Sequence, residues 1–438
     1  MLKKHPRALA FIFFTEMWER VGFYTLMAIL VLYMDKVLGW SDARKGDFYG
    51  LFLFVCYLMP LVGGWLGDKL IGQIRTVRIG AVLMALGYVG LALSGPGQVA
   101  TFYCGLLLIG LGTGLFKVNM AVLVGGLYAG KPELKDAGFN IFYMGVNLGA
   151  LIAPWIATLN NAVFKSYNLS FWIAAVGMVF ALIIFRAGAT VLRPYDCKLG
   201  DGQAGPLRPS GPTPPGASAG AACPAMDKRE AWQRVATLII LFLIIIFFWV
   251  AFYQNFFGLT LFAERSTVVL KWLRPETYQS FEPFFILALT PLLLALFSRL
   301  NRRKREPSTP VKILLGMLIM SLAMLVMVRA SLAGGNGDRT VMSPAWLIGT
   351  YFFVTLAEIL ISPMGQSFVS KVAPPRIAGL MMGGWFAATA AGSIISGQLG
   401  KFYGRLPHHV FFLVLAGLML LAAVLVAIFL KKLKRFAT

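Results

Sequence analysis

Long apolar segments alternate with short polar segments along almost the entire chain. Twelve of these segments have the length and apolar content of a membrane-spanning helix, which needs roughly 20 mostly apolar residues. They lie near residues 8–34, 48–67, 77–94, 99–127, 136–158, 169–192, 231–262, 279–299, 310–332, 343–370, 376–398 and 409–431. The pattern therefore predicts an all-α integral membrane protein with 12 transmembrane helices.

The break between the sixth and seventh segments, residues 193–230, is rich in Pro, Gly and Ser. This composition is typical of a flexible linker, and the break has no apolar run long enough for an extra linker helix. We therefore expect a six-helix bundle over 1–192, a cytoplasmic linker over 193–230 and a second six-helix bundle over 231–438. This layout resembles that of the major facilitator fold, whose halves rock around a central site.

The composition agrees with a membrane protein. Of the 438 residues, 58% are hydrophobic and only 13% are charged, whereas a soluble domain has about 25% charged residues. Soluble enzymes, disordered proteins and disulfide scaffolds are therefore excluded. The four cysteines form no Cys-x-x-Cys pair, so neither a zinc site nor a disulfide framework is indicated. We expect no metal and no cofactor.

The basic residues predict the orientation in the membrane. The net charge is +22, which in a soluble protein would suggest nucleic-acid binding. Here the basic groups gather in alternate short loops and tails, so we expect no nucleic-acid partner and a cytoplasmic location for both termini. The residues that set this orientation include Lys3, Lys4, Arg7, Lys69, Arg75, Arg78, Lys131, Lys135, Arg302, Arg305, Lys431, Lys432, Lys434 and Arg435. No targeting motif stands out, and we expect a multi-pass protein of a bacterial inner membrane.

Charged residues inside the predicted spans are the candidates for function, because each costs about 2.5–3.5 kcal/mol at the centre of an isolated span. They are Glu16, Glu19 and Arg20 in the first span, Lys117 in the fourth, Glu282 at the start of the eighth and Glu358 in the tenth. On a helix, Glu16, Arg20, Phe23 and Met27 share one face, with Glu19 and Tyr24 at its edges. Such a face must line a cavity or pair with another helix.

Two interpretations of these charges remain open. They could form internal salt bridges that hold helices together, or they could form a polar cavity in which carboxylates bind and release protons. Buried ion pairs are weak stabilisers, which favours the second interpretation. His5, His408 and His409 lie at or outside the membrane edges, so we expect carboxylates to carry any protons.

Several motifs resemble those of the proton-dependent oligopeptide transporter (POT) family, a branch of the major facilitator superfamily. Glu16-Met-Trp-Glu19-Arg20 is similar to its ExxER signature, and the loop with Gly64, Asp68, Lys69 and Gly72 is similar to the superfamily's cytoplasmic gating motif. Further similar segments are 114–119, 142–149, 362–365 and 379–386. The chain is identified as a member of this family.

The resemblance implies a symporter that imports di- and tripeptides by alternating access. It implies that Glu16, Glu19 and Arg20 couple protons to gating and to binding of the peptide carboxylate, with Lys117 as a basic gate. It also implies that Glu358 and Asn147 hold the peptide amino terminus. The residues expected to line the binding pocket are Phe23, Tyr24, Met27, Tyr57, Tyr253 and Trp385. We expect the protein to act as a monomer.

Three positions depart from the family pattern. Met27 stands where an Arg is usual, Tyr253 where an acidic residue is usual, and Glu282 where an Asn is usual. We expect Glu282 to take over as a gate or as a partner of the substrate amine. We also expect that Arg20 and Lys117 alone recognise the substrate carboxylate.

Two alternatives remain. The first keeps the fold and the coupling but changes the substrate to a peptide-like drug, an amino-acid conjugate or an anion. The second is a sensor that binds a ligand without transporting it. An enzyme is not expected, because the spans show no nucleophile with an adjacent base and no metal-ligand cluster.

Overall fold

The computed structural model describes residues 5–128, 134–196, 228–374 and 377–435. Within these ranges the chain is helical and has no β-strand, apart from one isolated bridge between Thr267 and Met342. Most of the predicted linker over 193–230 lies outside the described residues. So do Lys3, Lys4 and Lys131.

Twelve described helices are long and apolar enough to cross a membrane, which confirms the predicted number of spans. The first six are α1 Ala8–Lys36, α2 Asp42–Leu66, α3 Gln73–Ala92, α4 Val99–Leu127, α5 Lys135–Leu159 and α6 Tyr167–Ala187. The last six are α8 Lys228–Phe252, α10 Phe281–Arg302, α11 Thr309–Ala333, α12 Pro344–Val372, α13 Ala378–Gly400 and α14 His408–Arg435. The shorter elements used below are α7 Ala189–Leu192, α9 Gly258–Arg265, the π-turn η2 Gly67–Ile71 and the 3-10 turns η6 Tyr253–Phe256 and η7 Pro275–Ser280.

The seventh predicted span, residues 231–262, is not one continuous helix. α8 ends before η6, and α9 begins at Gly258. The Gln254 side chain accounts for the break, because its amide oxygen accepts a hydrogen bond from the Gly258 N–H (3.2 Å) and its amide nitrogen donates to the Ser396 carbonyl (2.7 Å). A side chain that bonds to nearby backbone competes with the helical ladder, so this span consists of two helices joined by a 3-10 turn.

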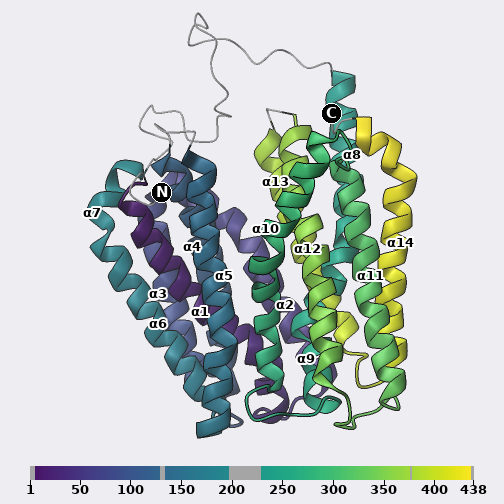
Figure 1. Cartoon of the computed structure of the whole chain (residues 1–438). Helices are drawn as coiled ribbons and strands as arrows, with labels where there is room; N and C mark the ends of the chain where they lie inside the picture. Colours follow the sequence, from purple (N-terminus) through teal and green to yellow (C-terminus); the bar gives the residue numbers. More distant parts are fainter. Residues whose placement is uncertain (1–4, 129–133, 197–227, 375–376, 436–438) are drawn as a thin grey trace, which may run out of the picture.

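The long helices run side by side, and α1 begins on the same side of the molecule as α14 ends (Figure 1). We call this side the termini end and the opposite side the far end. Three spans that start at the far end begin after a serine with extended backbone: Ser41, Ser166 and Ser343. Each serine oxygen accepts a backbone N–H of the first helical turn, which satisfies a group that the helix itself leaves unpaired.

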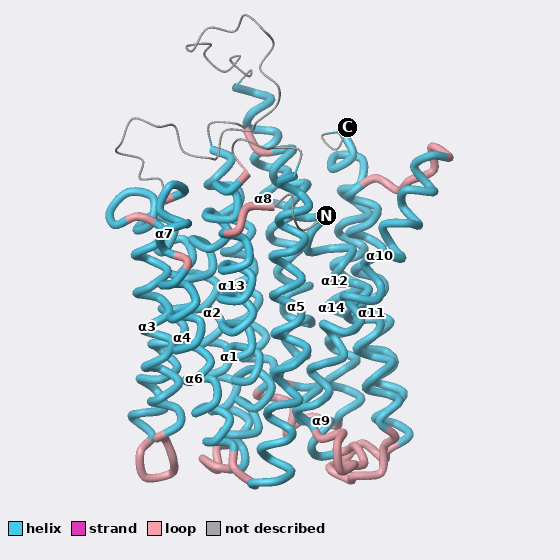
Figure 2. The backbone as a smooth tube through the Cα atoms, turned by 60° about the vertical axis from the view of Figure 1, so that its left-hand side comes forward, coloured by secondary structure: helices cyan, strands magenta, loops and turns pink. Residues whose placement is uncertain are grey.

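The helices pack as two bundles of six. In the first bundle α1 contacts α5 and α6, while α3 contacts α4 and α6; in the second, α11 contacts α12 and α14, while α8 contacts α13 and α14. The bundles meet along two helix pairs, α2 with α13 and α5 with α10. Figure 2 shows the short loops that join the spans at the far end.

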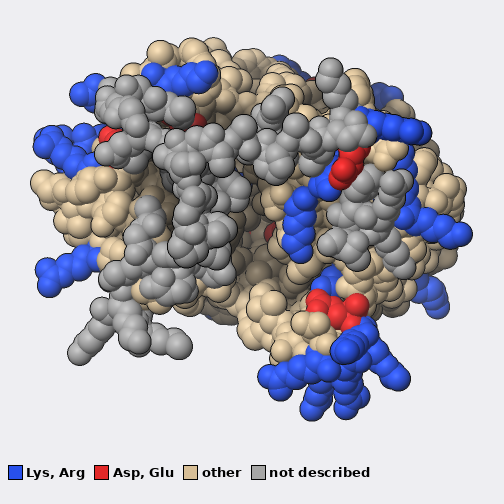
Figure 3. Space-filling view, turned by 90° about the horizontal axis from the view of Figure 1, so that it is seen from above, with Lys and Arg blue, Asp and Glu red and all other residues tan. Residues whose placement is uncertain are grey.

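The bundles are joined at the far end. Thr158 and Thr277 share a hydrogen bond between their hydroxyls (2.6 Å), and the Asn161 amide donates to Glu276 (2.9 Å). The Lys36 ammonium also pairs with Glu264. At the termini end, by contrast, the surface is hollowed near its centre (Figure 3). The molecule is therefore held shut on one side and opens on the other.

Glycines allow the close approach of α2 and α13. A Cβ built on Gly397 would overlap the Gly46 carbonyl oxygen and lie 2.7 Å from the Gly50 Cα. Both neighbours are backbone atoms of the facing helix and cannot rotate away. The contact between the bundles along this pair therefore depends on the missing side chain.

We expect Gly397→Ala to lower the free energy of unfolding by about 1–3 kcal/mol, as overpacking usually does. The measurement is the apparent melting temperature of the purified protein in detergent. Gly417→Ala is the matched control, because a Cβ on Gly417 meets nothing within 4 Å. Equal melting temperatures for the two variants would contradict the assigned packing.

Candidate functional site

Three charged residues of α1, which we call the α1 triad, lie buried together: Glu16, Glu19 and Arg20. The Arg20 Nε lies 3.1 Å from Glu16 Oε1 and 2.5 Å from Glu19 Oε2, and each of the three residues is at most 3% exposed. The helix itself creates this arrangement, because Glu16 is one turn before Arg20 and Glu19 is its neighbour. One guanidinium thus forms ion pairs with two carboxylates. Glu16 Oε2 and Glu19 Oε1 accept no hydrogen bond from the described residues.

Lys117 supplies a second cation beside the triad. Its ammonium lies 5.5 Å from the centre of the Tyr57 ring on α2, and it interacts electrostatically with all three triad residues. No carboxylate of the described residues comes within the 4.0 Å of an ion pair with it. Although Lys117 lies well inside α4, its side chain is exposed. It is therefore the accessible cation of the site.

A second polar group, which we call the Glu282 network, lies in the other bundle. Glu282 is in the first turn of α10, only 5% exposed, and accepts a hydrogen bond from the Asn255 amide of η6. The Asn255 carbonyl in turn accepts from the Gln279 amide (2.8 Å) and from the Tyr351 hydroxyl (3.4 Å). These bonds tie η6, η7, α10 and α12 together around one buried carboxylate.

Glu358 belongs to the same region. It lies two helical turns after Tyr351 on α12, so both side chains project from one face. Its carboxylate interacts electrostatically with that of Glu282. The ring centres of Phe285 on α10 and Phe352 on α12 lie 5.5 Å apart, and this contact holds the two helices together. The second bundle therefore presents two neighbouring carboxylates.

Tyrosines bridge the two bundles between these groups. The Tyr57 and Tyr253 rings lie 5.4 Å apart, and the Tyr49 hydroxyl donates to the Tyr253 carbonyl (2.6 Å). Tyr24 interacts electrostatically with Arg20 and with both carboxylates of the second bundle. These tyrosines thus lie between the α1 triad of the first bundle and the Glu282 network of the second.

The remaining predicted pocket residues take different positions. Phe23 lies under Arg20, with 5.3 Å between the guanidinium carbon and the ring centre. Met27 is 2% exposed within the apolar core, and Trp385 packs against Gly365 of α12 at 1% exposure. Asn147 donates to the Tyr143 carbonyl of its own helix (2.9 Å). The structure therefore places Phe23 at the triad but keeps Met27 and Trp385 in packed surroundings.

The predicted gating motif lies at the termini end, apart from the charged groups. Gly64 is on α2, while Asp68 and Lys69 form part of η2. Gly72 follows with a φ of +82°, a conformation that glycine adopts without strain, and a Cβ there would meet Asp196. Asp68 accepts a hydrogen bond from Gln73 (3.1 Å).

Sequence reasoning missed two sets of polar residues. Asn255 and Gln279 of the Glu282 network are uncharged; the only signal for Asn255 was its position in an aromatic run, and Gln279 lies in a polar segment in which it does not stand out. The second set, which we call the far-end cluster, comprises Asp35, Asp42, Lys45 and Arg265. Arg265 of α9 donates twice to Asp42 (2.9 and 3.1 Å) and once to Asp35 (3.0 Å), and Lys45 pairs with both carboxylates. It links the two bundles.

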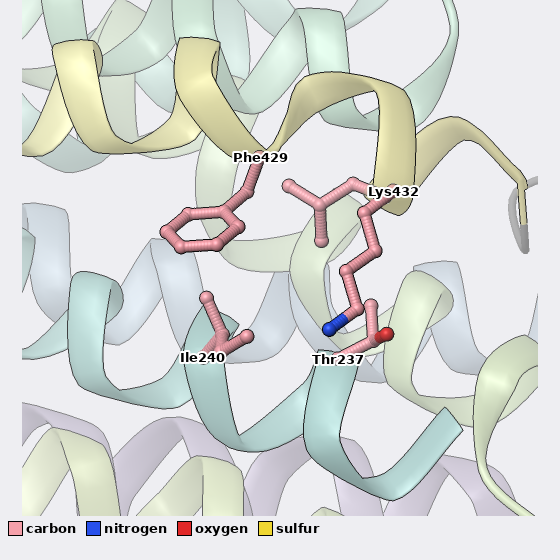
Figure 4. Close-up of a pocket in the computed structure, with 5 residues that line it drawn as sticks. Thr237, Ile240, Phe429 and Lys432 are labelled. Atoms are coloured by element: carbon pink, nitrogen blue, oxygen red, sulfur yellow. The ribbon is translucent and has the colours of Figure 1, made fainter. Parts of the chain in front are cut away.

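Among the described residues, no group of three or more His, Cys, Asp or Glu could hold a metal ion. A small gap between α8 and α14 is lined by Thr237, Ile240, Phe429, Lys432 and Leu433 (Figure 4). None of these five is a predicted site residue.

Comparisons with known proteins identify similar chains. A family model described as the POT family matches residues 74–198 and 217–414. The chain is 33% identical to an uncharacterized transporter, YclF, of Bacillus subtilis (strain 168), over 95% of this chain and 93% of the relative. It is 30% identical to the peptide transporter YePEPT of Yersinia enterocolitica, over 90% of this chain and 88% of the relative.

A solved structure has the same fold. The crystal structure of a peptide transporter POT in complex with sulfate superimposes with a TM-score of 0.85 at 29% sequence identity. The match covers 99% of this chain and 96% of that chain. The arrangement of helices described above is thus that of a major facilitator transporter.

Removal of the Arg265 side chain is expected to weaken the contact between the two bundles at the far end. We expect Arg265→Met to lower the free energy of unfolding by about 1–3 kcal/mol, because Asp35 and Asp42 then share only Lys45. Thermal unfolding in detergent measures this, with Arg405→Met as the control because Arg405 is an exposed cation at the same end. If Arg265→Met melts like the wild type, the far-end cluster does not hold the bundles together.

Proposed function

The chain belongs to the POT family of transporters, and we propose that it is a proton-coupled symporter that imports di- and tripeptides by alternating access. The observation that carries the proposal is the α1 triad, two carboxylates buried against one guanidinium, beside the accessible cation Lys117. The family match begins at residue 74, so the role of the triad rests on its geometry and on the motif in α1.

The balance of charge at the site couples binding of a proton to binding of the peptide carboxylate. With all four groups ionised, Glu16, Glu19, Arg20 and Lys117 sum to zero. A peptide carboxylate that binds Lys117 adds one negative charge next to the buried α1 triad, where an unbalanced charge is costly. A proton on one carboxylate of the triad restores neutrality. Binding of the peptide carboxylate and of a proton therefore favour each other.

The amino terminus of the peptide binds on the opposite side. Glu358 and Glu282 project from the second bundle, and Asn147 from the first, so a peptide lies between them with its carboxylate toward Lys117. The tyrosines Tyr24, Tyr57 and Tyr253 pack along its backbone. A zwitterion thus fits the two bundles, with the accessible cation Lys117 in one and the carboxylates Glu282 and Glu358 in the other.

Rocking of the bundles exposes this site to each side in turn. The far end is closed by the far-end cluster, and the hollow opens toward the termini end (Figure 3). The positive-inside rule places the termini end in the cytoplasm, so this conformation faces inward. Outward opening requires the far-end ion pairs to break. The protein then works as a monomer in the inner membrane, since both gates lie within one chain.

Uptake of dialanine into proteoliposomes tests the proposal. We expect accumulation only with an acid-outside, negative-inside gradient, because 100 mV supplies about 2.3 kcal/mol per charge moved. Glu19→Gln should abolish the dependence on the gradient, since a neutral amide cannot accept the proton. Glu306→Gln is the control, because Glu306 pairs with Lys312 outside the site.

Two outcomes would contradict symport. Uptake that is equally fast without a gradient would point to facilitated diffusion. Binding of dialanine without any uptake would favour the ligand sensor. Neither outcome would alter the assignment to the family.

Recognition of the peptide carboxylate rests on Lys117, because Arg20 is already occupied by two carboxylates and Met27 offers no charge. We expect Lys117→Gln to weaken binding of dialanine about tenfold, which corresponds to about 1.4 kcal/mol. Dialanine amide has no carboxylate and should lose little affinity. Competition binding of both ligands measures the difference, and an equal loss for both would refute this role of Lys117.

A further inference from the structure

The second bundle carries one more negative charge than a simple peptide can balance. Glu282 and Glu358 are neighbouring carboxylates that interact electrostatically, whereas a peptide with an uncharged first side chain brings a single ammonium. In α10 no Lys or Arg occurs before Arg299, and in α12 none occurs before Lys371. The chain's own cations therefore leave this pair of carboxylates without a partner along these helices.

The surroundings of the pair contain buried acceptor atoms without a hydrogen-bond partner. Asn255 and Gln279 are 1% and 2% exposed, and their amide nitrogens are engaged with Glu282 and with the Asn255 carbonyl, respectively. The amide oxygens of both residues, and Glu358 Oε2, accept no hydrogen bond from the described residues. Buried polar atoms normally have partners. These three unpartnered atoms are acceptors, and an ammonium group with three N–H donors can satisfy such a set.

The network also holds Glu282 in place. The carboxylate is bonded to Asn255, and Asn255 is bonded through its carbonyl to Gln279 and Tyr351. A carboxylate fixed in this way cannot turn away to water when the substrate binds. Its charge must be balanced where it lies, by a proton or by a cation of the substrate.

We propose that Glu282 and Glu358 each receive one positive charge of the same substrate. The transporter then prefers peptides, or peptide-like amines, whose first residue has a cationic side chain. This inference rests on the proposed function and specifies its substrate class. Glu358 binds the terminal ammonium, and Glu282, with the amide oxygens of Asn255 and Gln279, binds the side-chain ammonium.

The test compares two ligands that differ only in the second charge. Lysyl-alanine and norleucyl-alanine have first side chains of nearly the same length, but only lysine ends in an ammonium. We expect wild-type protein to bind lysyl-alanine about tenfold more tightly, the size of effect of one good charge-assisted contact. Competition binding in detergent measures this without requiring transport, so a failure of symport does not obscure the result.

The variant Glu282→Gln should bring the two affinities to within about threefold of each other. Glu306→Gln, a carboxylate variant outside the site, should keep the tenfold ratio. Equal affinity of the wild type for both ligands, or a preference for norleucyl-alanine, overturns the inference. So does a Glu282→Gln variant that weakens both ligands by the same factor. Should that variant fail to fold, the wild-type ratio alone still decides the question.

Discussion

Burial of two carboxylates beside a single guanidinium is the constraint on which the rest of the structure depends. Glu16, Glu19 and Arg20 lie buried on one helix, and Arg20 alone cannot neutralise both acids. The neighbouring helices must therefore supply a compensating charge and a polar surface. Lys117 of α4 supplies the charge, and Tyr57 of α2 supports its ammonium.

The second bundle also contains carboxylates that neighbouring polar groups must accommodate. Glu282 and Glu358 have amides and hydroxyls around them, and the first cations on their own helices are Arg299 and Lys371, more than three helical turns further along. The first bundle thus presents the Lys117 ammonium and the second bundle presents two carboxylates, which suits the proposed zwitterionic ligand. Glycines let α2 and α13 approach closely, while Arg265 ties the far end together.

Much of the architecture followed from local properties of the sequence. The twelve spans were predicted within a few residues, because each is a continuous apolar run and desolvation of the backbone in a bilayer permits little except helix. The α1 triad was predicted because charges in such runs stand out. The break in the seventh span was not predicted, because the bonds of Gln254 depend on Ser396, which lies in another helix 142 residues away.

Composition and the apolar runs determined the class of protein and the number of spans. The period of the helix determined contacts within one helix, such as that of Glu16 with Arg20. Only the tertiary structure decided which polar residues meet between helices. Asp42 and Arg265 are separated by 223 residues, and Asn255 faces Glu282 only because η6 and α10 are brought together. Such pairings are set by helix packing, in which a polar group finds the partner that spares it the cost of unpaired burial, and no periodicity along the chain encodes that partner.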